Sequence, residues 1–200
     1  MARLLGRERE QRYLDLLDYG NRDASSGLES FWLDVLRDLA MTELELGDFV
    51  GARAHLESAL QLDDLSAHDH KVCTGHLNLA EVELALGNPK SAARHWAAGA
   101  TGIEFGYMAE YYIGCVLVGA MCCVGAGHHA EGALLYGVAD ALSRASGERF
   151  EPYEAERREA DLVVLTNALG DSESVRIRAE GEQLTFAESM RLAHGTLSGC

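Results

Sequence analysis

The sequence predicts an all-α fold, an α-solenoid in which antiparallel helix pairs stack one on the next. The first observation is that Gly47, Gly87 and Gly127 recur at an interval of about 40 residues, and intervals of this size are typical of repeat architectures. The second is that each glycine lies between two small residues at the same spacing. The third is that the chain lacks the alternating β-branched runs that strands require.

Small residues mark the place where the two helices of each unit are expected to cross closely. They form the pairs Ala40 with Ala52, Ala80 with Ala92, and Ala120 with Gly132. A bulky residue follows each pair on the same helical face, and we expect it to fill the groove towards the neighbouring unit. These bulky residues are Leu56, Trp96 and Tyr136.

Each of the three glycines is expected to end a helix in the left-handed conformation. Asp48 and Asn88 follow two of them and are predicted to cap the next helix, with Pro89 at its first position. At the third glycine, His128 and His129 are interpreted as an improvised cap.

The period divides the chain into a partial repeat and about three full repeats. Residues 1–25 are interpreted as the second helix of a preceding repeat, ending in a loop at 20–27. Their apolar face consists of Leu4, Tyr13, Leu14, Leu16 and Leu17. Full repeats are predicted at about 26–62, 66–101 and 102–146, and the first consists of helices 26–46 and 49–62. All the links are short, so neighbouring helices should be antiparallel.

Residues 147–200 lie outside the period and are predicted to form a helical C-terminal cap of the same domain. A helix begins at Pro152 and ends at Gly170, Asp171 caps a second helix, and Thr185 with Glu188 forms a capping box for a third. Terminal units of a solenoid differ from internal ones because one side faces water.

Composition excludes several classes of protein. A chain of 200 residues that is 48% hydrophobic is expected to form one folded unit. The net charge of −15 argues against direct nucleic-acid binding and against docking on anionic membranes. The N-terminus lacks a signal peptide, which predicts a cytoplasmic protein. The uncharged run 111–127 is the one membrane candidate and is interpreted as the buried first helix of the third repeat.

The chemistry-bearing residues do not form a recognisable catalytic motif. Glu43, Glu45, Glu81 and Glu83 have helical spacing and are interpreted as a solvated face. We therefore predict neither an enzyme nor a bound cofactor. The chain has five cysteines, an odd number, and we interpret them as small buried side chains in a reduced protein.

A histidine and cysteine cluster is the best candidate for a metal site. It consists of His68, His70, Cys73 and His76, whose side chains suit zinc or copper. On a helix these residues spread around the surface, so they are interpreted as part of the first helix of the second repeat, and no metal site is predicted.

The small and bulky positions resemble those of the tetratricopeptide repeat (TPR). The early Trp, the Tyr after the first small residue and the late Pro of that repeat are absent, and the period is about 40 rather than about 34 residues. Longer helices account for the difference, and armadillo and HEAT repeats share the longer period.

The end of the chain resembles the C-terminal region of bacterial MalT, LuxR-type and AfsR-type transcriptional regulators, which are signalling ATPases. The positions that carry this resemblance are Ala179, Gly181, Leu184, Thr185 and Glu188. The resemblance implies a TPR sensor or scaffold region for signal transduction. The chain has neither a phosphate-binding G-x-x-x-x-G-K-[ST] loop nor a basic helix-turn-helix, so ATP hydrolysis and DNA binding do not carry over.

The resemblance to TPR arrays implies a concave groove lined by the first helix of each repeat. The predicted groove residues are Arg37, Met41, Glu45, Thr74, Leu77, Glu81, Leu117 and Met121. Such a groove suits a peptide or a helix from a protein partner. Alternatively, the same positions pack against a further repeat or a second copy of the chain in a homodimer.

Two functions remain open at this point. The first is a non-enzymatic protein–protein interaction or sensor module of a bacterial transcription-regulatory protein. The alternative is a regulatory receptor that encloses a small apolar molecule within the solenoid. The candidate walls of that cavity are Trp96, Tyr107, Tyr111, Tyr112 and Met121.

Overall fold

The computed structural model describes residues 2–22, 29–61, 70–106 and 109–199, and over these residues the protein is all-helical. The described part contains ten α-helices, one 3₁₀ turn and no strand. The predicted all-α class is therefore confirmed.

The helices follow one another with short connections. They are α1 (Ala2–Arg22), α2 (Glu29–Leu46), α3 (Phe49–Gln61), α4 (His70–Ala85), α5 (Pro89–Gly106), α6 (Tyr112–Gly125), α7 (His129–Ser146), α8 (Pro152–Leu169), α9 (Asp171–Gly181) and α10 (Phe186–Leu197), and the 3₁₀ turn η1 (Ala109–Tyr111) precedes α6.

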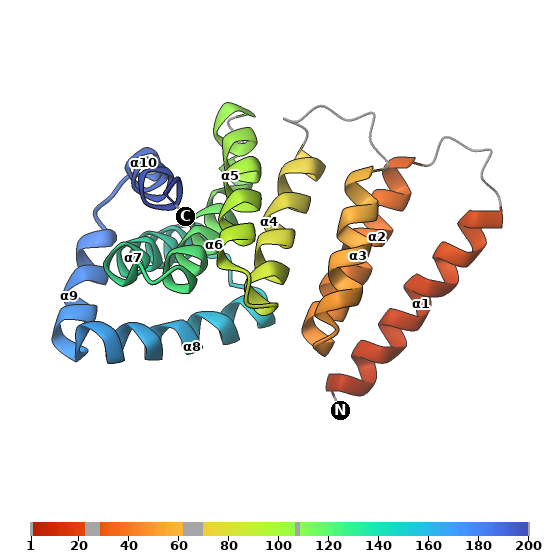
Figure 1. Cartoon of the computed structure of the whole chain (residues 1–200), viewed down its shortest axis with the longest axis horizontal. Helices are drawn as coiled ribbons and strands as arrows, with labels where there is room; N and C mark the ends of the chain where they lie inside the picture. Colours follow the sequence, from red (N-terminus) through yellow and green to blue (C-terminus); the bar gives the residue numbers. More distant parts are fainter. Residues whose placement is uncertain (1, 23–28, 62–69, 107–108, 200) are drawn as a thin grey trace.

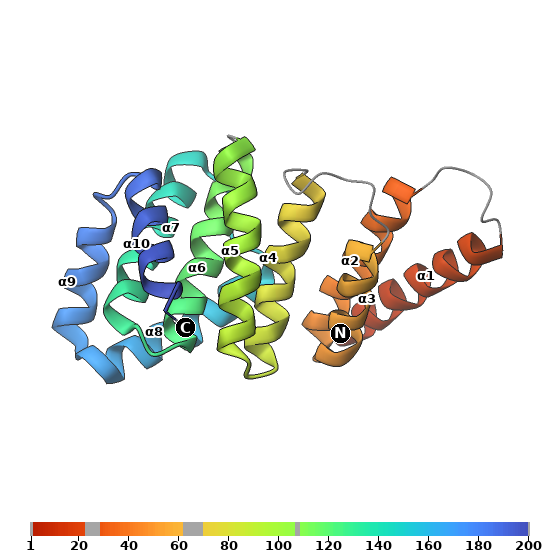
Figure 2. The ribbon, with the colours of Figure 1, turned by 45° about the horizontal axis from the view of Figure 1, so that its top comes forward.

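Neighbouring helices pack in pairs that succeed one another along the long axis of the molecule (Figures 1 and 2). The tightest pairs are α2 with α3, α4 with α5, and α6 with α7. The last three helices break this order. Helix α8 lies across the preceding helices in Figure 1, α9 packs against α7, and α10 packs against α5, α6 and α7.

The three periodic glycines end the first helix of each pair as predicted. Gly47, Gly87 and Gly127 have φ values of 86°, 78° and 86°, which place them in the left-handed region that favours glycine. Each pair therefore reverses direction at the same position.

The predicted caps are only partly correct. The Oδ1 of Asp48 accepts a hydrogen bond from the backbone N–H of Gly51 at 3.0 Å, as expected for an N-cap. The Asn88 amide instead donates to Glu83 Oε2 at 2.9 Å, and His128 makes no side-chain cap.

The capping features of the last three helices were also predicted with mixed success. Asp171 is the first helical residue of α9, after an N-cap at Gly170. The capping box predicted for α10 is confirmed. The N–H of Glu188 donates to the Thr185 hydroxyl at 3.3 Å, and the N–H of Thr185 donates to the Glu188 carboxylate at 2.8 Å. Pro152 begins α8 as expected.

The small residues lie where the paired helices cross. Ala40, Ala52, Ala80, Ala92 and Ala120 are fully buried. The sixth small residue is Gly132 of α7. A Cβ on Gly132 would lie 2.7 Å from Cγ2 of Val124, so α6 and α7 are too close for a side chain there.

Each bulky residue contacts the element that follows its own pair. Leu56 packs in one cluster with Leu79 and Val82 of α4. The indole N–H of Trp96 donates to the carbonyl of Cys115 in α6 at 2.9 Å. The hydroxyl of Tyr136 reaches α8, as described below.

Two element boundaries differ from prediction. Helix α1 continues through 20–22, where a loop was expected, and Leu14 and Leu16 on its predicted apolar face are exposed. Helix α5 continues to Gly106, past the predicted repeat boundary near 102, whereas the first helix of the third pair begins at Tyr112, as the run 111–127 predicted. The reason is local, because no proline interrupts α5 after Pro89. The expected helix start at 26 and the ends of the predicted loops lie outside the described residues.

The largest cluster of buried side chains joins α4–α7 to α8, α9 and α10. Residues 115–124 of α6 are all buried, which confirms that this uncharged run is a core helix. Cys73, Cys115, Cys122 and Cys123 are buried, as predicted, and Cys200 lies outside the described residues. None of the described helices combines the length and the apolar character that crossing a membrane requires.

A backbone contact between α7 and α9 gives a test of this packing. A Cβ on Gly137 would collide with the carbonyl oxygen of Arg178. We expect Gly137→Ala to lower the free energy of unfolding by about 3 kcal/mol, measured by urea denaturation, because backbone cannot move aside as a side chain can. The matched control is Gly195→Ala in α10, where no atom lies within 4 Å. This change should stabilise the protein by up to about 1 kcal/mol, and equal effects of the two alanines would contradict the packing.

Candidate functional site

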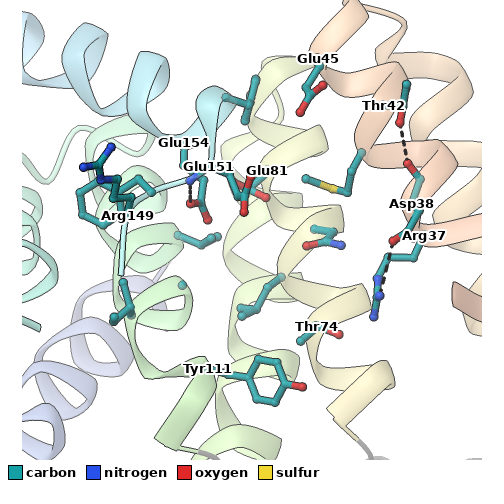
Figure 3. A pocket seen from close by; sticks show the side chains of 18 of the residues that line it. Arg37, Asp38, Thr42, Glu45, Thr74, Glu81, Tyr111, Arg149, Glu151 and Glu154 are labelled. Atoms are coloured by element: carbon teal, nitrogen blue, oxygen red, sulfur yellow. Dashed lines mark hydrogen bonds and ion pairs between the residues drawn. The ribbon is translucent and has the colours of Figure 1, made fainter. Parts of the chain in front are cut away.

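A cavity of about 610 Å³ lies on the face formed by α2, α4 and α6 (Figure 3). Residues from α1 and η1 also line it, together with the segment 148–154 that connects α7 to α8 and begins α8. The cavity is therefore built from elements distributed over most of the chain.

Six of the eight predicted groove residues line this cavity. Helix α2 contributes Arg37, Met41 and Glu45, and helix α4 contributes Thr74, Leu77 and Glu81. The helical spacing on these two helices thus brings together the residues that the sequence grouped. Whether they bind a partner is a separate question, which the proposals below address.

Leu117 and Met121 do not line the cavity. Both are fully buried in the large core cluster, because α8 and α10 pack against α6. On α6 the lining residues are instead Ile113, Gly114 and Val118. The prediction that Leu117 and Met121 line the groove is therefore wrong.

Helix α8 closes one side of the cavity, a role that the sequence did not reveal. Gly147, with φ 79°, ends α7 and lets the chain turn, and Pro152 begins α8. Tyr153 in the first turn of α8 then packs against the cluster formed by α2, α3 and α4. The glycine and the proline were the only sequence signals of this turn.

Two polar contacts between α7 and α8, Tyr136 with Asp161 and Arg158 with Asp140, fix the direction of α8. The Tyr136 hydroxyl donates to Asp161 Oδ2 at 2.7 Å, and Arg157 Nε donates to Asp161 Oδ1 at 3.0 Å. Arg158 donates to both carboxylate oxygens of Asp140 at 2.9 and 2.6 Å. Paired and hydrogen-bonded charges of this kind specify one orientation.

Glu81 is the most unusual residue of the cavity. Its side chain is only 3% exposed, and among the described residues its Oε1 has no hydrogen-bond partner. Burial raises the pKa of Glu81 well above its ordinary value, and the negative charge of Glu154 raises the pKa further, whereas Arg157 lowers it. Figure 3 shows Glu81 and Glu154 beside each other at the cavity, in agreement with the effect of Glu154 on the pKa of Glu81.

Glu154 is held by the start of α8. Its Oε2 accepts a hydrogen bond from the backbone N–H of Glu151 at 2.8 Å. Burial raises the pKa of Glu154 as well, despite this hydrogen bond. Two carboxyl groups are therefore kept close together in a poorly hydrated place.

The lining is strongly acidic. Seven of the lining residues carry carboxyl groups, and three are arginines. Arg9 forms an ion pair with Glu45, and Arg37 lies 3.5 Å from Asp38 and 3.6 Å from Asp34. Two of the three arginine charges are thus already matched by neighbouring acids, and the cavity suits a cation better than an anion.

The predicted solvated acidic face is wrong for three of its four residues. Glu43, Glu81 and Glu83 are buried. The Oε2 of Glu43 lies 2.8 Å from Nδ1 of His55, and Glu83 receives the hydrogen bond from Asn88 described above. Glu43 and Glu83 tolerate burial because they have partners on the second helix or the turn of the same pair.

The histidine and cysteine cluster is dispersed. His70 is exposed and Cys73 is fully buried, while His76 stacks on His95 with their Nδ1 atoms 3.2 Å apart. Burial lowers the pKa of His76. In the described ranges no three His, Cys, Asp or Glu side chains are placed to hold a metal ion, and His68 lies outside these ranges.

The aromatic walls proposed for an apolar cavity serve other contacts. Trp96 packs against His194, and Tyr112 stacks on Phe186 with ring centroids 3.6 Å apart. Tyr111 lines the cavity, and Tyr107 lies outside the described residues. The cavity is consequently lined mainly by polar and aliphatic residues.

Comparison of the chain with models of protein families, with curated proteins and with solved structures finds no match.

Burial of Glu81 predicts a pH-dependent stability. Because the pKa of Glu81 is raised in the folded state, its carboxyl group favours folding below the ordinary pKa of 4.5. That contribution is lost as the pH rises through the raised pKa. We expect Glu81→Gln to raise the melting temperature at about pH 8, by an amount equivalent to about 1–3 kcal/mol, and to have little effect near pH 4.

The control for this experiment is Glu159→Gln, which removes one charge from an exposed position of α8 outside the cavity. Its melting temperature should follow that of the unaltered protein at every pH. Destabilisation by Glu81→Gln at about pH 8 would show that the Glu81 carboxylate is solvated or paired.

Proposed function

We propose that the protein is a non-enzymatic interaction module that binds a peptide or protein partner in the cavity formed by α2, α4 and α6. The observation that carries the proposal is the convergence of six residues from two successive helix pairs on one cavity. Adjacent helices that present successive side chains to a groove are a recurring way of recognising peptides.

The proposal includes a solenoid architecture resembling TPR arrays, with about three repeats. It is supported by the equivalent roles of equivalent positions. The left-handed glycines, the buried small residues and the bulky residues that contact the next element recur in all three pairs. A solenoid would explain why side chains from different pairs face the same side.

A role in a bacterial transcription-regulatory protein of the cytoplasm is the cellular part of the proposal. It is supported by the resemblance of the C-terminal tail to bacterial regulators. Two of the tail residues have clear structural duties, since Thr185 caps α10 and Gly181 permits the close crossing of α9 and α7. The module would act there as a sensor or scaffold through protein contacts rather than by binding DNA.

A small-molecule-responsive receptor remains the second candidate, because the cavity volume lies within the range of small-ligand sites. The acidic lining favours a polar and cationic ligand for such a receptor, in place of the apolar one that the aromatic residues suggested.

Photo-crosslinking in cells of the native host tests the proposed function. A photoreactive phenylalanine analogue replaces Thr74, which lines the cavity, or Val163, which is 61% exposed on α8 and lies outside it. We expect a discrete protein adduct from position 74 and none of the same mass from position 163.

Adding Met41→Arg should abolish the adduct at position 74, because the longer side chain would fill part of the cavity and its positive charge would occupy the acidic lining. Circular dichroism checks that this variant keeps its helical content. Identical adducts from both positions, or an adduct that persists with Met41→Arg, would contradict binding in the cavity.

A further inference from the structure

We propose that the cavity receives the guanidinium group of an arginine side chain on the partner peptide, with Glu81 and Glu154 as the carboxylates that bind it. This inference rests on the proposed function and specifies the chemistry of the partner. It is carried by the unpartnered oxygen of Glu81, by the neighbouring Glu154 and by the charge of the lining.

The first argument is the unsatisfied oxygen of Glu81. Buried acceptors in folded proteins almost always have a hydrogen-bond partner, yet Oε1 of this nearly buried side chain has none in the described part of the chain. Glu81 lines the cavity and is drawn facing it in Figure 3. A cation with N–H donors in the cavity would supply both the missing hydrogen bond and the missing charge.

The second argument is that, among the described residues, no arginine forms an ion pair with Glu81 or Glu154, and this includes Arg149, which lines the cavity. Arg157 is the cation that lowers the pKa of Glu81, but its Nε donates to Asp161 of the same helix. Glu154 interacts with the backbone of Glu151 rather than with a basic side chain. The carboxyl pair therefore has a deficit of positive charge.

The third argument concerns the kind of cation. A guanidinium group presents several N–H donors in a planar fork and can bridge two carboxylates, whereas an ammonium group is a more strongly hydrated point charge. The cavity is also larger than one side chain and is lined by residues from α1 to α8. This favours an arginine whose peptide backbone continues along the cavity over a free amine.

Fluorescence anisotropy with short labelled peptides tests the inference. The probe is an acetylated Ala-Gly-Arg-Gly-Ala peptide, and its control replaces Arg by citrulline, which has the same shape without the charge. We expect the arginine peptide to bind at least about tenfold more tightly than the citrulline peptide. A lysine version should fall between them.

The protein variants locate the binding energy. Glu81→Gln and Glu154→Gln should each weaken binding of the arginine peptide by about tenfold or more, because each removes a carboxylate that contacts the cation. Glu159→Gln removes one charge from an exposed position outside the cavity and should bind as the unaltered protein does. Melting curves establish that all three variants are folded before binding is measured.

Several results would overturn the inference. They are equal binding by Glu81→Gln and Glu159→Gln, equal binding of the arginine and citrulline peptides, and binding that requires added Mg²⁺ and disappears with a chelator. Agmatine, a free guanidinium compound, provides the remaining arm. If agmatine binds more tightly than the arginine peptide and this binding depends on Glu81, the guanidinium group belongs to a small molecule and not to a peptide.

The proposed function can fail separately from this inference. A partner adduct at position 74 combined with peptide binding that ignores Glu81 would leave the interaction module standing and remove the arginine site. Glu81-dependent binding of agmatine without any protein adduct would remove the interaction module, since it would favour a receptor for a small cation.

Discussion

The crossing of α8 over the preceding helices is the constraint on which the rest of the site depends. Without α8, the face of α2, α4 and α6 would be an open groove. The contact of Tyr153 with the cluster beneath α2 and α4 turns that face into a cavity and removes water from Glu81. The direction of the crossing is fixed by the hydrogen bond from Tyr136 to Asp161 and by the bidentate ion pair of Arg158 with Asp140. The shape of the cavity and the burial of Glu81 therefore have one structural cause.

The site also illustrates a conflict between stability and binding. A buried carboxyl group without a partner lowers the stability of the folded chain, and a second carboxyl group beside it increases the cost. Such arrangements concentrate at functional sites because a ligand that supplies the missing charge recovers what folding lost. Glu43 provides the contrast, since it is equally buried and is matched by His55 within its own helix pair.

The sequence predicted what depends on the helical period, and it missed what depends on the last three helices. The glycine turns and the small crossing positions follow from the interval of about 40 residues, and the cavity residues of α2 and α4 follow from helical spacing together with the resemblance to TPR arrays. Leu117 and Met121 occupy equivalent positions on α6, but α8 and α10 cover that helix, and these cap helices have no periodic relation to it. The burial of Glu81 was missed for the same reason, because its spacing on α4 is that of a surface residue until α8 is placed above it. Gly147 and Pro152 signal that the chain turns, yet they do not specify where the next helix goes.

The most direct test is a carboxyl carbon NMR titration of the protein with labelled glutamate, in which Glu81→Gln assigns the Glu81 signal. The structure predicts that Glu81 titrates well above the exposed glutamates, and that saturating arginine peptide shifts its titration towards lower pH because the cation favours the ionised form. A Glu81 signal that titrates together with the exposed glutamates, whether or not the peptide is present, would contradict the account of a desolvated carboxyl group held for a cationic partner.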